Sequence, residues 1–502
     1  MSLDLKILNG NIIDGTGNKA YVSDIGIKDG KIVEIGNLSS NLAKETINAD
    51  GYIVTPGFID LHTHYDGQIS WDSELTPSSI HGVTTVVTGS CGVGFAPCKE
   101  KDREKLITLM EGVEDIPGSA LSEGINWKWE TFTEYMNAID SIPHTIDFAM
   151  QMTHDPLRVY VMGDRAVANQ KATEDDIKKM AKILREGLIS GAVGFSTGRT
   201  DNHKSGRGED TPAAEASVEE LTGIVQAFKG INHGIIQAVS DFDMLKGDEF
   251  FDKEFDVLEK MALVSNKPLS ISLMQRDQSP NQWQWIIKRA EEANSKGINI
   301  RLQVGARAIG VLLGLETTFQ PFMGFPSYKK ISNLPLEERV RIMKNPEFKE
   351  KLLKEKNEKL AGDGSHIPPL ADILLSQLDI IGMRMFKLGE KPNYEPEIKD
   401  SIGYKAKQKG ESIIGALYDA LLEDEGKALI YFPLYNYTEF NLNNLYKMIN
   451  HPLSLPGLSD GGAHVGTVCD ASFPTFMLTH WCRDRKGDKF NLEKIIKNKL
   501  KT

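Results

Sequence analysis

From Pro56 onward the chain alternates short apolar runs with longer amphipathic stretches, and this pattern constrains its fold more than any other feature. Residues 84–87 have the length of a strand, whereas residues 174–188 have the length and apolar periodicity of a helix. Such alternation predicts a parallel sheet with crossover helices. Nine apolar runs qualify as strands: 57–61, 84–87, 146–150, 192–196, 235–239, 269–273, 298–304, 428–432 and 453–458.

A closed (β/α)8 barrel has eight strand positions, so one of these runs is surplus. We assign it to an insertion at about residues 309–426, a stretch that is helix-like, charged and interrupted by prolines. This insertion is either a surface decoration or a lid over the mouth of the barrel. Before Pro56, pairs such as Asn9-Gly10 and Asp29-Gly30 suit tight hairpins and predict a small antiparallel β-unit.

The composition excludes several classes of protein. With 58 Lys and Arg against 70 Asp and Glu, the 502 residues carry a formal charge of −12, which argues against a surface for nucleic acid or anionic membrane. The start of the chain lacks a signal-peptide pattern, and no apolar run approaches the ~20 residues of a membrane helix. We therefore predict a soluble, cytoplasmic protein. Its four cysteines are too few for a disulfide scaffold, so each is by default a reduced, buried thiol.

The chemistry of a (β/α)8 barrel lies at the C-terminal ends of its strands, and two histidines follow the first strand. Side chains alternate along an extended backbone, so His62 and His64 point to the same face, as two ligands of one metal ion would. Cys91 follows the second strand between glycines that allow close approach of the backbone. A thiolate and two imidazoles suit Zn²⁺, although an isolated cysteine would more simply be a packed apolar thiol.

Asp460 follows the last strand in Ser459-Asp460-Gly461-Gly462 and is the predicted general base. There it would bind the metal and take a proton from the activated water that attacks an amide carbonyl. The alternative is a turn in which the carboxylate has no chemical role. His464 would polarise the carbonyl or support a ligand from behind.

Three further side chains are predicted to bind substrate, each with a structural alternative. Arg199 follows the fourth strand, in a basic loop that also holds His203, and would bind a substrate carboxylate unless its charge is simply solvated. His154, after the third strand, would line the pocket or hydrogen-bond a loop. Gln237, in the fifth, would donate to a substrate carbonyl or serve the structure. Weaker candidates for the carboxylate lie near later strand ends: Arg276, Arg301 and Arg307.

Together these segments resemble the amidohydrolase superfamily, and within it the N-acyl-D-amino-acid deacylase (D-aminoacylase) branch. The resemblance rests on the β-rich start and on three motifs in chain order: PGFIDLHTH at 56–64, GVTTVVTGSCG at 82–92 and GLSDG at 457–461. It implies a TIM-like (β/α)8 barrel paired with a small β-sandwich, and hydrolysis of a linear amide on an N-acyl-D-amino acid by zinc-activated water. In this branch a cysteine after the second strand replaces a carboxylated lysine. Cys91 matches that cysteine, and residues 191–198 contain no lysine.

The chain departs from this branch in two ways. Relatives carry a zinc-binding histidine after the fifth strand and another after the sixth, but residues 236–241 and 270–276 contain none. We therefore predict one divalent metal ion, zinc by donor type, held by His62, His64, Cys91 and Asp460. In the family the sandwich is completed by strands after the barrel, whereas here its second half is expected to be truncated. The expected units are the first part of the sandwich at 1–55, the barrel with its insertion at 56–480, and a short C-terminal segment at 481–502.

We predict a metal-dependent hydrolase of linear carbon–nitrogen bonds other than peptide bonds, which deacylates an N-acyl-D-amino acid or a similar N-acyl compound. One alternative is a small-molecule-binding barrel with a degenerate metal site and no catalysis. Another is an ester, lactone or carbamate hydrolase, because the same activated water attacks those carbonyls. The expected partner is the small-molecule substrate, with neither nucleic acid nor membrane. A homo-oligomer is compatible with the sequence, which specifies neither the acyl chain nor the stereochemistry.

Overall fold

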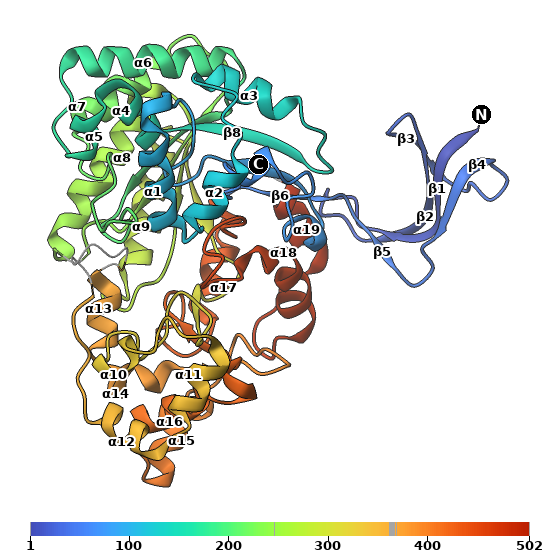
Figure 1. Ribbon diagram of the computed structural model, residues 1–502. Coiled ribbons are helices and arrows are strands. Elements are labelled where there is room, and N and C mark those ends of the chain that lie inside the picture. The colour runs from blue at the N-terminus through green and yellow to red at the C-terminus, as the bar shows by residue number, and fades with distance from the viewer. Residues whose placement is uncertain (1, 245, 361–366, 368, 501–502) are drawn as a thin grey trace.

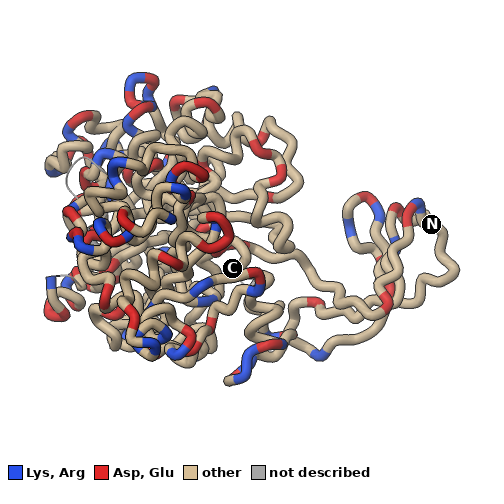
Figure 2. The backbone as a smooth tube through the Cα atoms, turned by 60° about the horizontal axis from the view of Figure 1, so that its bottom comes forward, with Lys and Arg blue, Asp and Glu red and all other residues tan. Residues whose placement is uncertain are grey.

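The computed structural model describes residues 2–244, 246–360, 367 and 369–500. Figure 1 shows an N-terminal sheet that projects from a barrel, and a lobe of short helices below the barrel. Acidic and basic residues are interspersed along the chain (Figure 2). Within the described ranges, no helix is both long enough and apolar enough to cross a membrane.

Eight parallel strands form the barrel, and they follow one another around it in chain order. They are β6 (Phe58–Asp60), β7 (Val83–Thr88), β8 (Asp147–Thr153), β9 (Gly194–Arg199), β10 (Ile235–Ser240), β11 (Leu269–Ser272), β12 (Ile300–Val304) and β16 (Ser454–Pro456). A parallel bridge between Thr63 and Gly461 joins the two ends of the sheet, so the first and last strands meet. The predicted TIM-like (β/α)8 barrel is therefore confirmed.

Helices cover the outside of the barrel, so most residues of its strands are buried. Helix α6 illustrates why they form. Thr173 and Asp176 cap its first turn reciprocally, and Met180, Leu184 and Leu188 bury one stripe at helical spacing. The helices around the barrel are α1 (Arg103–Glu114), α2 (Gly118–Gly124), α3 (Phe132–Asp140), α4 (His154–Met162), α5 (Asp164–Val167), α6 (Glu174–Ile189), α7 (Val218–Ile224), α8 (Phe251–Ser265), α9 (Gln282–Ser295), α17 (Asn443–Asn450), α18 (Phe473–Phe476) and α19 (Leu492–Leu500).

The segment between β12 and β16 builds its own small sheet and its own apolar core. Strands β13 (Gly310–Leu313) and β14 (Phe386–Lys387) both pair antiparallel with β15 (Ile430–Pro433). The surplus run at 428–432 is thus β15, which lies outside the barrel. The core of this lobe is separate from that of the barrel and centres on Phe322 and Tyr418. Its helices are α10 (Pro326–Lys329), α11 (Leu336–Met343), α12 (Pro346–Leu353), α13 (Pro369–Leu375), α14 (Leu378–Ile381), α15 (Ile402–Lys409) and α16 (Ile413–Leu421).

The N-terminal sheet is mixed, so the prediction of a purely antiparallel unit is wrong. Its strands are β1 (Leu3–Ile12), β2 (Tyr21–Lys28), β3 (Lys31–Gly36), β4 (Ala43–Asn48) and β5 (Ile53–Val54). The hairpins β1–β2 and β2–β3 are antiparallel as expected, but β4 and β5 pair parallel with β1. After β3 the chain crosses to the other side of β1, and Leu38 in this crossover is fully buried. Large apolar side chains remain exposed on this sheet: Val22, Ile32, Ile35, Tyr52 and Ile53.

Candidate active site

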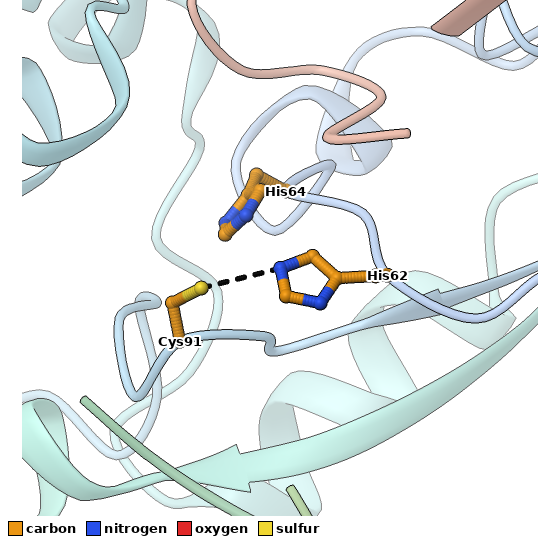
Figure 3. Close-up of side chains that lie close together, drawn as sticks. All are labelled: His62, His64 and Cys91. Atoms are coloured by element: carbon orange, nitrogen blue, oxygen red, sulfur yellow. Dashed lines mark hydrogen bonds between the residues drawn. The ribbon is translucent and has the colours of Figure 1, made fainter. Parts of the chain in front are cut away.

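Two imidazoles and one thiol converge at the C-terminal end of the first two barrel strands. The donor atoms of His62, His64 and Cys91 all lie within 4.8 Å of one another, and all three side chains are buried. His62 Nε2 is 3.2 Å from Cys91 Sγ (Figure 3). The H-x-H motif follows β6 and Cys91 follows β7, so the parallel pairing of these strands brings the three donors together. This is a donor set that suits Zn²⁺.

The glycines beside Cys91 are needed because the loop passes close to two neighbouring strands. A side chain at Gly89 would overlap the carbonyl oxygen of Gln151, and one at Gly92 would lie 2.6 Å from the backbone nitrogen of Gly198. Cys91 itself has φ 56°, in the left-handed region. Burial, together with nearby carboxylates, raises the pKa of its thiol well above the ordinary value. A cation at this position would reverse that effect, because coordination keeps a thiol deprotonated.

The outer nitrogens of both imidazoles are held by side chains from other elements. Gln303 Oε1 lies 2.7 Å from His62 Nδ1. Glu114 Oε1 lies 3.1 Å from His64 Nδ1, within ion-pair distance but off the direction of a hydrogen bond. Burial lowers the pKa of His64 to about 4, so this ring is neutral at neutral pH. Each ring has an oxygen beside Nδ1 and presents Nε2 to the cluster, as metal-binding histidines do.

Asp460 and His464 enter the same cluster from the loop after the last barrel strand. Asp460 Oδ1 lies 3.3 Å from His62 Nε2 and 3.6 Å from His64 Nε2. Burial alone would raise the pKa of Asp460, but its hydrogen bond with His64 and the surrounding imidazoles lower it overall, so it is ionised at neutral pH. His464 Nε2 is 3.6 Å from Glu114 Oε2. The four predicted metal-binding residues therefore lie together, with Asp460 contacting the imidazoles.

A cavity of about 240 Å³ opens above this cluster. The predicted residues His62, His64, Cys91, Asp460 and His464 all line it. Other lining side chains come from the loops after β9, β10 and β11 and from the insertion, among them His203, Asp241, Met274, Arg276 and Tyr435. Residues 236–241 and 270–276, which lack the histidines of the family, also contribute Ser240 and Ser272 to the lining.

The three predicted substrate-binding residues lie behind this lining and have other partners. Arg199 is held by Glu254, with Nε 2.5 Å from Oε1 and Nη2 3.0 Å from Oε2, so its charge is already paired. His154 is buried between Thr197 and Glu220. Gln237 Oε1 accepts from the backbone N–H of Cys91 at 2.9 Å, which fixes the cysteine loop.

Sequence reasoning missed Glu114 and Gln303, which lie beside the two imidazoles, and named Arg276 only as a weaker candidate, although it lines the cavity. Gln303 ends a barrel strand, so the rule that strand ends carry chemistry could have found it. Glu114 is the last residue of helix α1, and no local pattern distinguishes it from other acidic residues on that helix.

Comparison with known proteins identifies the family of this chain. The chain belongs to the amidohydrolase family, which it matches over residues 45–358. It is similar to the D-aminoacylase of Alcaligenes xylosoxydans xylosoxydans, with 33% identity over 235 residues that cover 47% of this chain and 43% of the relative. The N-acyl-D-aspartate deacylase of the same organism is 31% identical over 227 residues, covering 45% and 41% of the two chains. The match therefore spans less than half the length of these curated relatives.

The fold is also similar to that of solved structures. One is the N-acyl-D-glutamate deacylase of Bordetella bronchiseptica, complexed with zinc and a phosphonate inhibitor. It superposes with a TM-score of 0.61 at 20% identity, covering 99% of this chain and 84% of that one. A D-aminoacylase structure gives a TM-score of 0.60 at 21% identity. The predicted resemblance to the D-aminoacylase-like branch is thus confirmed.

Proposed function

We propose that the protein is a zinc-dependent amidohydrolase that removes the acyl group from an N-acyl amino acid. The observation that carries this proposal is the convergence of His62 Nε2, His64 Nε2 and Cys91 Sγ, with both outer ring nitrogens engaged by other side chains. Two imidazoles and a thiol, all buried, form a donor set that fits a divalent cation. One ion suffices for these donors, and one D-aminoacylase of the same fold is described as activated by one metal and attenuated by a second.

The residues of the chain divide the work of hydrolysis among them. His62, His64 and Cys91 would hold the metal with Asp460, and a bound divalent cation would supply Lewis acidity at the scissile carbonyl and at water. The ionised Asp460 accepts the proton of the attacking water and returns it to the leaving nitrogen. His464 faces the cavity and stabilises the negative charge that develops on the carbonyl oxygen.

We assign binding of the substrate carboxylate to Arg276 in place of Arg199. Arg276 lines the cavity and is only 2% exposed. Its guanidinium donates to two neutral acceptors, Gln282 Oε1 at 3.0 Å and the carbonyl oxygen of Ser240 at 2.9 Å. Among the described residues, Asp241 attracts Arg276 across the cavity, but it forms no ion pair with it. A buried cation that lacks a direct ion pair is costly, and the carboxylate of an N-acyl amino acid would supply that pair. The D configuration is carried over from the names of the relatives.

Metal analysis beside an activity assay tests this function. The purified protein should contain about one zinc per chain or gain activity with added Zn²⁺ or Co²⁺, and it should hydrolyse N-acyl-D-amino acids faster than their L enantiomers. Metal-free protein that stays inactive on a broad amide panel after metal addition would contradict the proposal. Ligand binding that survives Cys91→Ala and Asp460→Asn, without turnover, would favour the non-catalytic alternative. Faster cleavage of matched esters or carbamates than of amides would favour a different scissile bond.

A further inference from the structure

A second cavity, which we name the apolar chamber, lies where the insertion meets the barrel. It measures about 150 Å³. The same five residues line both the chamber and the metal-site cavity, so the two cavities lie side by side. They are Asn202, Val311, Phe319, Leu434 and Tyr435.

Hydrocarbon side chains make up the rest of the chamber. They come from β13, helix α13, the segment from Ile381 to Met385 and β15, which all belong to the lobe between β12 and β16. Within the described part of the chain, they are Leu313, Ala371, Leu374, Leu375, Ile381, Met385 and Phe432, and none carries a charge. The polar groups of the chamber, on Asn202 and Tyr435, are on the shared wall. A lining of this kind favours a hydrocarbon group over a polar one.

We propose that the apolar chamber holds the hydrocarbon chain of the substrate's acyl group, so that the substrate is an N-acyl amino acid with a medium-length fatty acyl chain. This inference rests on the proposed function, which places the amide carbonyl at the metal cluster. The two halves of such a substrate differ in polarity. The amino-acid half carries a carboxylate, and Arg276 lines the metal-site cavity but not the chamber. The acyl half beyond its carbonyl is hydrocarbon alone, which matches the chamber.

The size of the chamber sets the length of the chain. An apolar cavity of about 150 Å³ holds a molecule the size of benzene, which corresponds to about six carbon atoms beyond the carbonyl. Each methylene that enters the chamber should raise kcat/KM by about threefold to fourfold, because burial of hydrocarbon favours binding in proportion to its area. The rise should stop near heptanoyl or octanoyl.

A series of N-acyl derivatives of one amino acid, from acetyl to decanoyl, tests the proposal in the full-length protein. The expected result is a steep rise in kcat/KM up to heptanoyl or octanoyl and no gain beyond it. An acetyl derivative that is hydrolysed as well as the octanoyl derivative would overturn the proposal while leaving the amidohydrolase function intact. So would a rate that follows the length of the amino-acid side chain instead of the acyl chain.

Variants that change the volume of the chamber sharpen the test. Ala371→Leu adds about three carbon atoms inside the chamber and should lower kcat/KM for the octanoyl derivative about thirtyfold, with the acetyl derivative within twofold. Leu313→Ala enlarges the chamber and should move the optimum to longer chains. Ile373→Phe is the matched control, because Ile373 lies on α13 but is exposed and outside the chamber. Equal effects of Ala371→Leu on both substrates would overturn the proposal.

Binding of octanoate separates the failure of this inference from the failure of the proposed function. If no amide is hydrolysed, calorimetry still measures whether octanoate binds in the chamber. Binding that Ala371→Leu abolishes and Ile373→Phe leaves intact would support the chamber although the amidohydrolase function had failed. Octanoate that binds no better than acetate would overturn the proposed role of the chamber, whether or not the protein hydrolyses amides.

Discussion

The two walls of the active-site region differ in the polarity of their side chains. The metal-binding wall, at the ends of β6, β7 and β16, is polar, and its imidazoles are held from behind by Gln303 and Glu114. The wall that the insertion contributes is hydrocarbon, and it belongs to a lobe with its own core. Under our proposals the first wall supplies reactivity and the second supplies selectivity. Different segments of the chain encode the two walls, and five residues line both cavities.

The largest effect is expected from breaking the metal-binding wall itself. Cys91→Ala removes the sulfur donor and should abolish stoichiometric metal binding. It should lower kcat/KM by at least about a thousandfold, which is more than the loss of a residue that only supports a ligand would cause. Metal analysis and steady-state kinetics measure both. Cys98→Ala removes another buried thiol and should change neither. A Cys91→Ala protein that keeps its metal would show that the sulfur is only packing.

A smaller loss of metal affinity is expected when the side chain beside His64 is changed. Glu114→Gln keeps the size of the side chain but replaces the carboxyl group beside His64 with an amide, and should weaken metal affinity or activity about 10- to 100-fold. Metal titration against a competing chelator measures this. Glu104→Gln, on the exposed face of the same helix, is the control. Equal metal affinity in both variants would mean that Glu114 does not position His64.

A change in selectivity, with little change in metal content, is expected at Arg276. The wild type should prefer an N-acyl amino acid over the matching carboxamide. Arg276→Gln should reduce that preference about tenfold, because it removes a charge-assisted contact with the carboxylate. Ratios of kcat/KM for the two substrates report this, and a purely structural role would lower both values together. Arg301→Gln, where the arginine bonds Asn294, should leave the ratio unchanged.

The smallest effect concerns how the insertion is attached to the barrel. Glu395 of the insertion lies 2.8 Å from His480 Nε2 and 3.0 Å from Arg485 Nη2. Burial would raise the pKa of Glu395, but these hydrogen bonds lower it to about 2, against an ordinary 4.5. Its contribution to stability is therefore complete above about pH 4.5 and is lost as the pH falls toward 2.

Denaturant unfolding from pH 6 to pH 2 measures that contribution. We expect Glu395→Gln to flatten the pH dependence by about 1 to 2 kcal/mol in the free energy of unfolding, with a discount for its partial exposure. Glu397→Gln, at an exposed ion pair with Lys399, should not change the slope. Identical slopes in wild type and Glu395→Gln would exclude this attachment.

The sequence predicted the barrel and the proximity of the donor side chains because both follow from local patterns. Alternating apolar runs specify parallel strands, and closure of the barrel then brings His62, Cys91 and Asp460 together although they are far apart in the chain. The same positional rule was misleading at Arg199, since its ion pair with Glu254 spans 55 residues and leaves no local signal. The contact of Glu114 with His64 likewise depends on where helix α1 packs.

Other features were beyond sequence reasoning because they depend on how separate segments meet. The parallel pairing of β4 with β1 follows from a crossover that hairpin turns do not reveal. The apolar chamber combines side chains from four parts of the lobe between β12 and β16, each of which reads in sequence as ordinary core. The divisions at residues 55, 309–426 and 480 stay predictions.

The depth of the donor cluster has a consequence for handling the protein. His62 and His64 are each 1% exposed and Cys91 is 6% exposed, and all three line the cavity to which we assign the substrate. A molecule seated in that cavity blocks the exit as well as the entrance. Substrate or product should therefore shield the metal from chelators, and the rate at which a chelator strips the protein should fall as the site fills.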